Sequence, residues 1–233
     1  MFYLNPQYLL YMAPALLVMF LAQWYVKSTY RKWGQVPARS RINGAEAAQR
    51  LKSSGGLHDV QIQSVQGELN DHYDPRKKVL KLSRDVSRGQ SVASLAIAAH
   101  ELGHAMQDKE GYLPLQFRSM LVPAVNIGST LGWILIMVGL LINLTGLAWL
   151  GVFAFSGGAV FALATLPVEI NASARAKKLL NQSGLIQGEK EKEGVNKVLN
   201  AAALTYVASL FTAVMQLLYW ISLVSGSGGR RRR

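Results

Sequence analysis

The chain has 233 residues, of which 50% are apolar or aromatic and only 16% are charged, whereas about a quarter of an average soluble protein is charged. It contains no cysteine, which excludes disulfide bonds and thiolate metal ligands. The net charge of +12 does not indicate nucleic-acid binding, because the basic residues flank apolar segments and are not interleaved with aromatic ones. We expect them to contact the anionic headgroups of a lipid bilayer, and we expect no nucleic acid as a partner.

Four long apolar stretches dominate the sequence, and each holds roughly twenty residues without Asp, Glu, Lys or Arg. Helices of this length cross the roughly 30 Å hydrocarbon core of a bilayer. We therefore predict a multi-pass protein of the cell membrane. Its predicted segments are a first transmembrane helix (1–26), a polar segment (27–120), a hairpin of two transmembrane helices (121–166), a second polar segment (167–200), a fourth transmembrane helix (201–224) and a basic tail (225–233).

The polar segment 27–120 is long enough for a small folded unit. Capping residues predict a helix over 44–52, and alternation of apolar and polar residues predicts a strand over 60–64. Turn-forming residues occupy 67–75, and a second strand is expected over 79–82. We expect this second strand to be an exposed edge strand, which would hold an extended peptide by main-chain hydrogen bonds.

The sequence His-Glu-Leu-Gly-His at residues 100–104 lies within a predicted helix over 91–107 that is otherwise rich in alanine. His100 and His104 are one helical turn apart, so both rings can reach a single ion. Glu101 can lie beside that ion and handle the proton of a water molecule bound to it. Ionisable groups in an apolar helix cost several kcal/mol, roughly, unless something pairs them. The pattern therefore predicts a zinc ion, Zn2+, held by the two histidines.

A catalytic zinc ion usually has three protein ligands. Because the chain has no cysteine and no histidine after His104, the third ligand is expected to be a downstream carboxylate. Glu169 is favoured, just inside a helix predicted to begin after Pro167. Two predicted spans separate it from the motif, so both lie on the same side of the membrane. Asp108 and Glu110 are alternatives, but they lie on or near the motif helix and approach the ion poorly.

The candidate metal-site residues are accompanied by several short motifs in a fixed order along the chain. The pattern comprises Asp71-His-Tyr-Asp-Pro75, Leu82-Ser83, the motif at 100–104, Leu166-Pro-Val-Glu169, Asn171-Ala-Ser173 and Arg175-Ala176. Together with the four spans, it resembles the YugP-like family of bacterial membrane zinc metallopeptidases. The resemblance implies a mainly α, polytopic membrane protein with four transmembrane helices and a small α+β zincin-like catalytic domain. It also implies a gluzincin-type peptidase, more distantly similar to the HtpX-like proteases.

Those more distant relatives carry an aspartate four residues after the glutamate ligand, where it orients a zinc-bound histidine. This chain has Ser173 at that position. The residues that orient the metal ligands must therefore differ in this chain.

The expected reaction is zinc-dependent hydrolysis of peptide bonds in protein or peptide substrates, with membrane or membrane-associated proteins favoured. His100, His104 and Glu169 would hold the zinc ion. Glu101 would take the proton of the attacking water and return it to the departing amine. A non-hydrolytic membrane scaffold or adaptor with a structural metal is the alternative, but a closed structural site needs a fourth protein ligand, and none is obvious.

Attack of water on the peptide carbonyl gives a negatively charged oxygen, the oxyanion. Three residues are candidates for the group that would help to stabilise it. His72 and Tyr73 precede the expected second strand, and Arg175 follows Glu169. By helical geometry, at roughly 100° per residue, Ser173 shares a face with Glu169 whereas Arg175 is well off it.

The distribution of cations predicts the orientation of the chain in the membrane. Most cations flank the two polar segments: Lys27, Arg31, Lys32, Arg39, Arg41, Lys109, Arg118, Arg175, Lys177, Lys178, Lys190, Lys192 and Lys197. The tail Arg230–Arg233 lies on the opposite side of the membrane and conflicts with the same rule. Because the larger set spans three membrane junctions, we predict a cytoplasmic active site with both termini outside.

Overall fold

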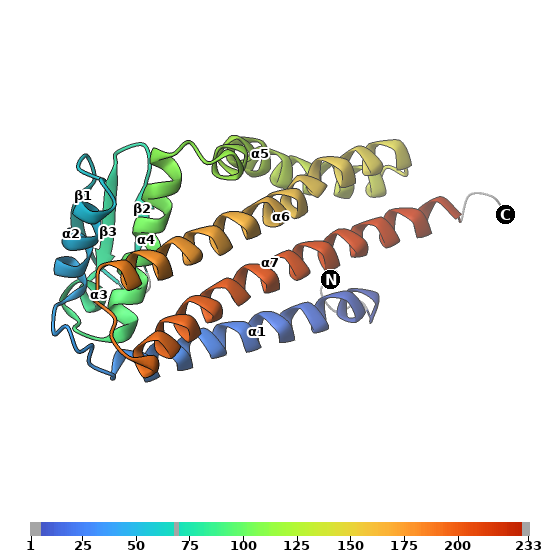
Figure 1. Cartoon of the computed structure of the whole chain (residues 1–233). Coiled ribbons are helices and arrows are strands. Elements are labelled where there is room, and N and C mark those ends of the chain that lie inside the picture. Colours follow the sequence, from blue (N-terminus) through green and yellow to red (C-terminus); the bar gives the residue numbers. More distant parts are fainter. Residues whose placement is uncertain (1–5, 68–69, 230–233) are drawn as a thin grey trace. The chain divides into compact units, whose positions relative to one another are not determined.

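The computed structural model describes residues 6–67 and 70–229 (Figure 1). The predicted tail residues Arg230–Arg233 lie outside this described part. The helices are α1 (Pro6–Gly34), α2 (Gly44–Ser54), α3 (Arg84–Arg88), α4 (Val92–Lys109), α5 (Leu113–Leu141), α6 (Thr145–Gln182) and α7 (Glu189–Gly229). The strands are β1 (Gln61–Val65), β2 (His72–Asp74) and β3 (Val79–Ser83).

Four of these helices, α1, α5, α6 and α7, are long and apolar enough to cross a membrane. This confirms the prediction of a mainly α, polytopic membrane protein with a small sheet. The chain divides into two compact units that we describe separately. The helical unit comprises the described residues of 1–22, 116–166 and 205–233, and the mixed unit comprises 23–115 and 167–204.

In the helical unit, small residues bring α5 and α6 into close contact. A Cβ atom added at Gly132 would lie 2.8 Å from the carbonyl oxygen of Gly151, and one added at Gly139 would lie 2.9 Å from the Cα atom of Ala148. Large apolar side chains such as Phe153, which is 77% exposed, point away from the protein. An exposed apolar surface of this kind suits lipid better than water.

In the mixed unit, the sheet has the strand order β1-β3-β2, with β1 parallel and β2 antiparallel to β3. The expectation that the second strand lies at an edge is therefore wrong, because β3 is the middle strand. The additional strand β2 forms within the segment predicted as a turn. Asp71, just before β2, accepts hydrogen bonds from the backbone amide and the hydroxyl of Ser83, which fixes this segment beside β3.

Capping hydrogen bonds begin both α2 and α4. Asn43 and Glu46 form the predicted capping box of α2, and the hydroxyl of Ser91 accepts a hydrogen bond from the amide of Ser94 at the start of α4. The helices α2 and α4 pack on each other, and α4 also contacts β2 and β3. Most of α4 is buried in a shared apolar core with residues of α2, β3 and the ends of α6 and α7 that belong to this unit.

The segment around Pro167 differs from the prediction. The sequence predicted a new helix after Pro167, but α6 runs without a break from Thr145 to Gln182. A single proline removes one backbone hydrogen bond, and helices near membranes tolerate this where neighbouring groups satisfy the freed carbonyls. Glu169 is therefore an interior helical residue, so a favourable interaction with the dipole at a helix N-terminus does not explain a carboxylate at this position.

Candidate metal centre

The mixed unit brings His100, His104 and Glu169 together. The Oε2 atom of Glu169 lies 3.3 Å from Nε2 of His100 and 3.4 Å from Nε2 of His104. The two imidazole rings are nearly perpendicular, with centroids 4.8 Å apart. Two imidazole nitrogens and one carboxylate oxygen therefore point toward one common location.

Two helices supply this arrangement. The helix α4 carries both histidines on one face, and the part of α6 that follows Pro167 lies beside it (Figure 1). The helices meet at Gly103, whose missing side chain lets the backbone of α6 approach. The glycine inside the motif thus places the carboxylate of Glu169 within reach of the two rings.

The centre is largely buried and rich in negative charge. The side chain of Glu169 is 2% exposed, and each of the two histidine side chains is 12% exposed. Glu101 is also buried. Burial disfavours the charged form of His104, but hydrogen bonding to Glu169 and the charge of Glu101 outweigh this effect and raise the pKa of the His104 imidazole above its ordinary value. Two carboxylates near the two imidazole rings make an environment that favours a bound cation.

The donor set fits zinc. One ligand atom from each of His100, His104 and Glu169 lies within 4.8 Å of the others. Two imidazoles and one glutamate are a ligand set of catalytic zinc sites, in which further positions stay open for water or substrate. Magnesium and calcium prefer ligand sets made of oxygen atoms, so the two histidines favour zinc over them.

The second nitrogen of each histidine also has a partner. The hydroxyl of Ser173 lies 3.2 Å from Nδ1 of His100, and Oε1 of Gln107 lies 3.0 Å from Nδ1 of His104. Ser173 therefore occupies the place in which the distant relatives carry aspartate. Sequence reasoning missed Gln107, because it lies next to Asp108 and Lys109 at the polar end of the helix and no local pattern distinguishes it.

The other acidic candidates are engaged elsewhere. Asp108 accepts hydrogen bonds from the Tyr73 hydroxyl, at 2.7 Å, and from the Lys78 ammonium, at 2.5 Å. Glu110 forms an ion pair with Arg175, with 2.7 Å between Oε2 and Nη1. Neither carboxylate belongs to the cluster of His100, His104 and Glu169.

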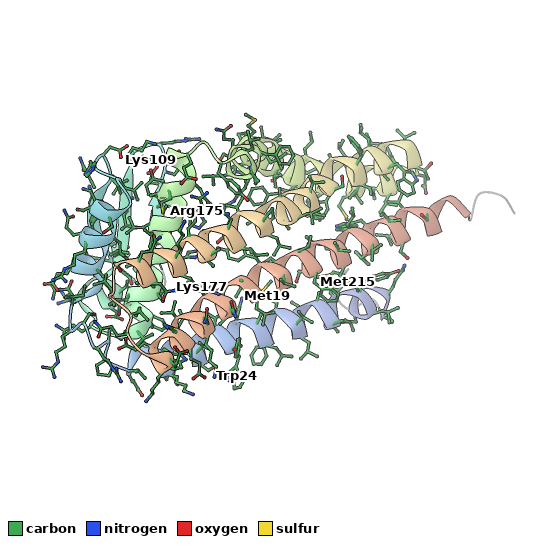
Figure 2. All side chains as sticks on the ribbon, in the orientation of Figure 1. Met19, Trp24, Lys109, Arg175, Lys177 and Met215 are labelled. Carbon is green, nitrogen blue, oxygen red and sulfur yellow. The ribbon has the colours of Figure 1, made fainter. Side chains whose placement is uncertain are left out.

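The three candidates for oxyanion stabilisation also have other partners. Nδ1 of His72 lies 2.8 Å from the carbonyl oxygen of Asn70. Burial and the hydrogen bond to Asp108 strongly raise the pKa of the Tyr73 hydroxyl, which therefore stays neutral. Arg175, labelled on α6 in Figure 2, is held by Asn171 and Glu110. Each of these side chains would have to leave a partner to reach a substrate.

Comparison with known proteins identifies the family of this chain. Residues 8–225 match the model of a family described as "Putative neutral zinc metallopeptidase", and the chain belongs to that family. The chain is 43% identical over 209 residues to the "Putative membrane protease YugP" of Bacillus subtilis (strain 168), a match that covers 90% of this chain and 92% of that protein. The resemblance seen in the sequence is thereby confirmed. No solved structure matches the chain.

Proposed function

We propose that this chain is a membrane-embedded zinc-dependent endopeptidase, with His100, His104 and Glu169 as metal ligands and Glu101 as the catalytic base. One observation carries the proposal: the Nε2 atoms of both histidines lie within 3.4 Å of the same buried carboxylate oxygen. The match to a family of zinc metallopeptidases supports it.

Each residue has a defined task in the proposed reaction. Bound zinc would polarise the scissile carbonyl group and acidify the attacking water. Glu101 takes one proton from that water as the water oxygen attacks the carbonyl carbon. The carboxyl group then delivers the proton to the nitrogen of the departing amine as the carbon–nitrogen bond breaks. The burial of Glu101 and the effect of its charge on His104 support this role.

We infer that the substrates are membrane or membrane-associated proteins, and that the site faces the cytoplasm. Glu169 follows the apolar stretch 147–166 by three residues, and α5 begins four residues after α4 ends. The metal centre is thus close, along the chain, to two membrane spans. The predicted segments 27–120 and 167–200 supply the catalytic residues, and their flanking cations support the cytoplasmic side.

The test of the function compares purified wild-type protein with the variants Glu101→Gln and Glu193→Gln, the latter as a surface control. We expect one zinc ion per chain in all three proteins, measured by elemental analysis. Casein cleavage should be lost in Glu101→Gln and kept in Glu193→Gln. Full cleavage by Glu101→Gln would overturn the proposed base, and wild-type protein without zinc would overturn the metal site.

The same experiment addresses the alternative of a non-hydrolytic scaffold with a structural metal. A structural zinc site usually has four protein ligands, whereas the cluster among the described residues has three. Stoichiometric zinc without any cleavage by the wild-type protein would favour the scaffold. A further comparison uses one substrate sequence with and without a membrane anchor. Faster cleavage of the anchored form would support membrane proteins as substrates.

A further inference from the structure

We propose that Gln107 is a positioning residue for the metal centre, because it fixes the tautomer of His104. The inference rests on the proposed function, since it concerns how a proposed zinc ligand is oriented. It is carried by a chain of hydrogen bonds that runs from Arg175 through Asn171 and Gln107 to His104.

The direction of the hydrogen bonds is set at the Arg175 end. A guanidinium group only donates hydrogen bonds. Its Nε donates to Oδ1 of Asn171 over 2.7 Å, which identifies that atom as the amide oxygen. The same oxygen accepts a hydrogen bond from Nε2 of Gln107 over 2.9 Å. The orientation of the Asn171 side chain thus defines the orientation of the next amide in the chain.

The amide of Gln107 has one possible orientation in this setting. Its NH2 group donates to Asn171 and, over 2.8 Å, to the backbone carbonyl of Val168. Its oxygen therefore faces Nδ1 of His104 at 3.0 Å. Because this oxygen only accepts, Nδ1 must carry the hydrogen atom. In the neutral ring the other nitrogen, Nε2, then carries the lone pair that can bind a metal ion, and it is the atom that lies beside Glu169.

The burial of Gln107 supports a specific role for its hydrogen bond to His104. Its side chain is fully buried, at 0% exposure, between α4 and α6. Burial of an amide is costly unless its hydrogen bonds are made, and an apolar side chain of similar size would pack at this position without that requirement. The partner of His100 differs in this respect, because the hydroxyl of Ser173 can either donate or accept. Gln107 therefore specifies a tautomer, whereas Ser173 does not.

The far end of the chain of hydrogen bonds is also held in place. Glu110 pairs with the guanidinium group of Arg175, and that group lies 5.8 Å from the ring centroid of Tyr112. Asn171, Arg175 and Glu110 line a cavity of about 510 Å³ in the mixed unit. The role that this gives Arg175 is to anchor Asn171, which differs from the role in oxyanion stabilisation considered from the sequence.

The test measures zinc affinity by competition with a chromophoric chelator, in the wild-type protein and in Gln107→Leu, Gln107→Glu and Gln182→Leu. We expect Gln107→Leu to bind zinc about 10- to 100-fold more weakly, as is typical when a group that orients a metal ligand is lost. Gln107→Glu keeps an acceptor for Nδ1 but loses the hydrogen bonds donated to Val168 and Asn171, so its affinity should lie between those of the wild type and Gln107→Leu. Gln182→Leu makes the same change at a cavity-lining glutamine outside the chain of hydrogen bonds, and it should bind as the wild type does.

A spectroscopic readout separates orientation from general destabilisation. The protein has four histidines, so nitrogen-15 spectra of histidine-labelled protein will be simple. We expect the His104 Nδ1–H tautomer in the wild type and a mixture of tautomers in Gln107→Leu. If Gln107→Leu does not fold, Asn171→Ala replaces it, because it removes one of the two acceptors that orient the Gln107 amide. Should it too fail to fold, Gln107→Glu decides: a loss of the Nδ1–H tautomer there would count against the proposal.

The outcomes distinguish this inference from the proposed function. Wild-type protein that binds no zinc contradicts the metal site itself, and with it the basis of the inference. Wild-type protein that binds zinc and cleaves casein, together with unchanged zinc affinity and an unchanged tautomer in Gln107→Leu, overturns the role of Gln107 alone.

Discussion

Gly103 of α4 packs directly against the backbone carbonyl of Ala172 of α6, so closely that a Cβ atom at residue 103 would overlap the carbonyl oxygen. In both helices, this contact lies close in sequence to the proposed metal ligands. Gly103 lies between His100 and His104, and Ala172 lies three residues after Glu169. The absence of a side chain at residue 103 therefore sets how closely the carboxylate approaches the two rings.

Gly103→Ala should consequently separate the two helices. The obstacle is backbone and not the end of a flexible side chain, so we expect a net destabilisation of about 1–3 kcal/mol from overpacking. Zinc affinity should fall as well, because Glu169 moves with α6. Thermal unfolding and chelator competition measure the two effects. Gly158→Ala on α6 is the control, because a Cβ atom there would meet nothing within 4 Å. Equal behaviour of the two variants would contradict the role of the contact.

The sequence predicted the features that depend on local pattern. The four long apolar helices follow from runs of uncharged residues. The juxtaposition of His100 with His104 follows from helical spacing. Glu169 was found by exclusion, and the structure places it beside both rings, while its role as a ligand stays a prediction.

The features that sequence reasoning missed depend on contacts between distant segments. The middle position of β3 depends on the pairing of β2 with β3, which the hydrogen bonds from Ser83 to Asp71 support. The continuity of α6 through Pro167 runs against the local preference, because a proline in a helix interior leaves the carbonyl of the residue four positions earlier, Leu163, without its usual donor. Neither effect is visible in a window of neighbouring residues.

Ser173 offers a second test of how the ligands are oriented. Its hydroxyl lies 3.2 Å from Nδ1 of His100, so we expect Ser173→Ala to lower zinc affinity by about tenfold. Ser173→Asp would place there the residue type of the distant relatives, and it should bind zinc at least as tightly as the wild type because a carboxylate accepts the Nδ1 hydrogen. Ser183→Ala, which removes a hydroxyl bonded only to the helix backbone at Leu180, serves as the control. Wild-type affinity in Ser173→Ala would show that His100 needs no such partner.

Removal of the metal should loosen the contact between α4 and α6. A bound ion stabilises the folded protein by about 2.7 kcal/mol when its free concentration is 100 times the dissociation constant. We therefore expect a chelator to lower the unfolding temperature of the wild-type protein and added zinc to restore it. Glu169→Gln should unfold at the same temperature with and without the chelator. A chelator effect of equal size in both proteins would mean that the chelator acts elsewhere.

Asp71 lies outside the metal centre, and its shifted pKa predicts that the unfolding free energy of the protein depends on pH. Burial raises the pKa of Asp71 above its ordinary value of 3.8, although hydrogen bonds from Ser83 oppose the shift. A raised pKa in the folded state means that the contribution of Asp71 to stability is fully present below pH 3.8 and is lost as the pH rises through the folded-state pKa. The unfolding free energy of Asp71→Asn should therefore rise, relative to that of the wild type, as the pH increases from 3.8 toward neutrality.

Asp74 provides a control with the opposite sign. Slight desolvation is outweighed there by hydrogen bonds from the backbone amides of Lys77 and Arg76, which lower the pKa of Asp74. Its contribution to stability is present above pH 3.8 and is lost as the pH falls through the lowered value. Asp74→Asn should thus lose stability, relative to the wild type, as the pH rises toward 3.8, and this difference should stay constant above pH 3.8, where the difference for Asp71→Asn grows. Urea unfolding at a series of pH values measures the unfolding free energy of both variants. Parallel changes in the two variants would contradict the raised pKa assigned to Asp71.

The orientation of the chain is testable because the protein has no cysteine of its own. A cysteine at Ser53, an exposed position at the end of α2 in the mixed unit, should be cytoplasmic if the cations flanking the polar segments set the topology. It should therefore resist an impermeant thiol reagent in intact cells and react after the cells are opened. A cysteine at Ser227, beyond the fourth predicted span, should react in intact cells. The reverse pattern would place the metal centre outside the cell, and it would indicate that the arginines at 230–233 dominate the topology.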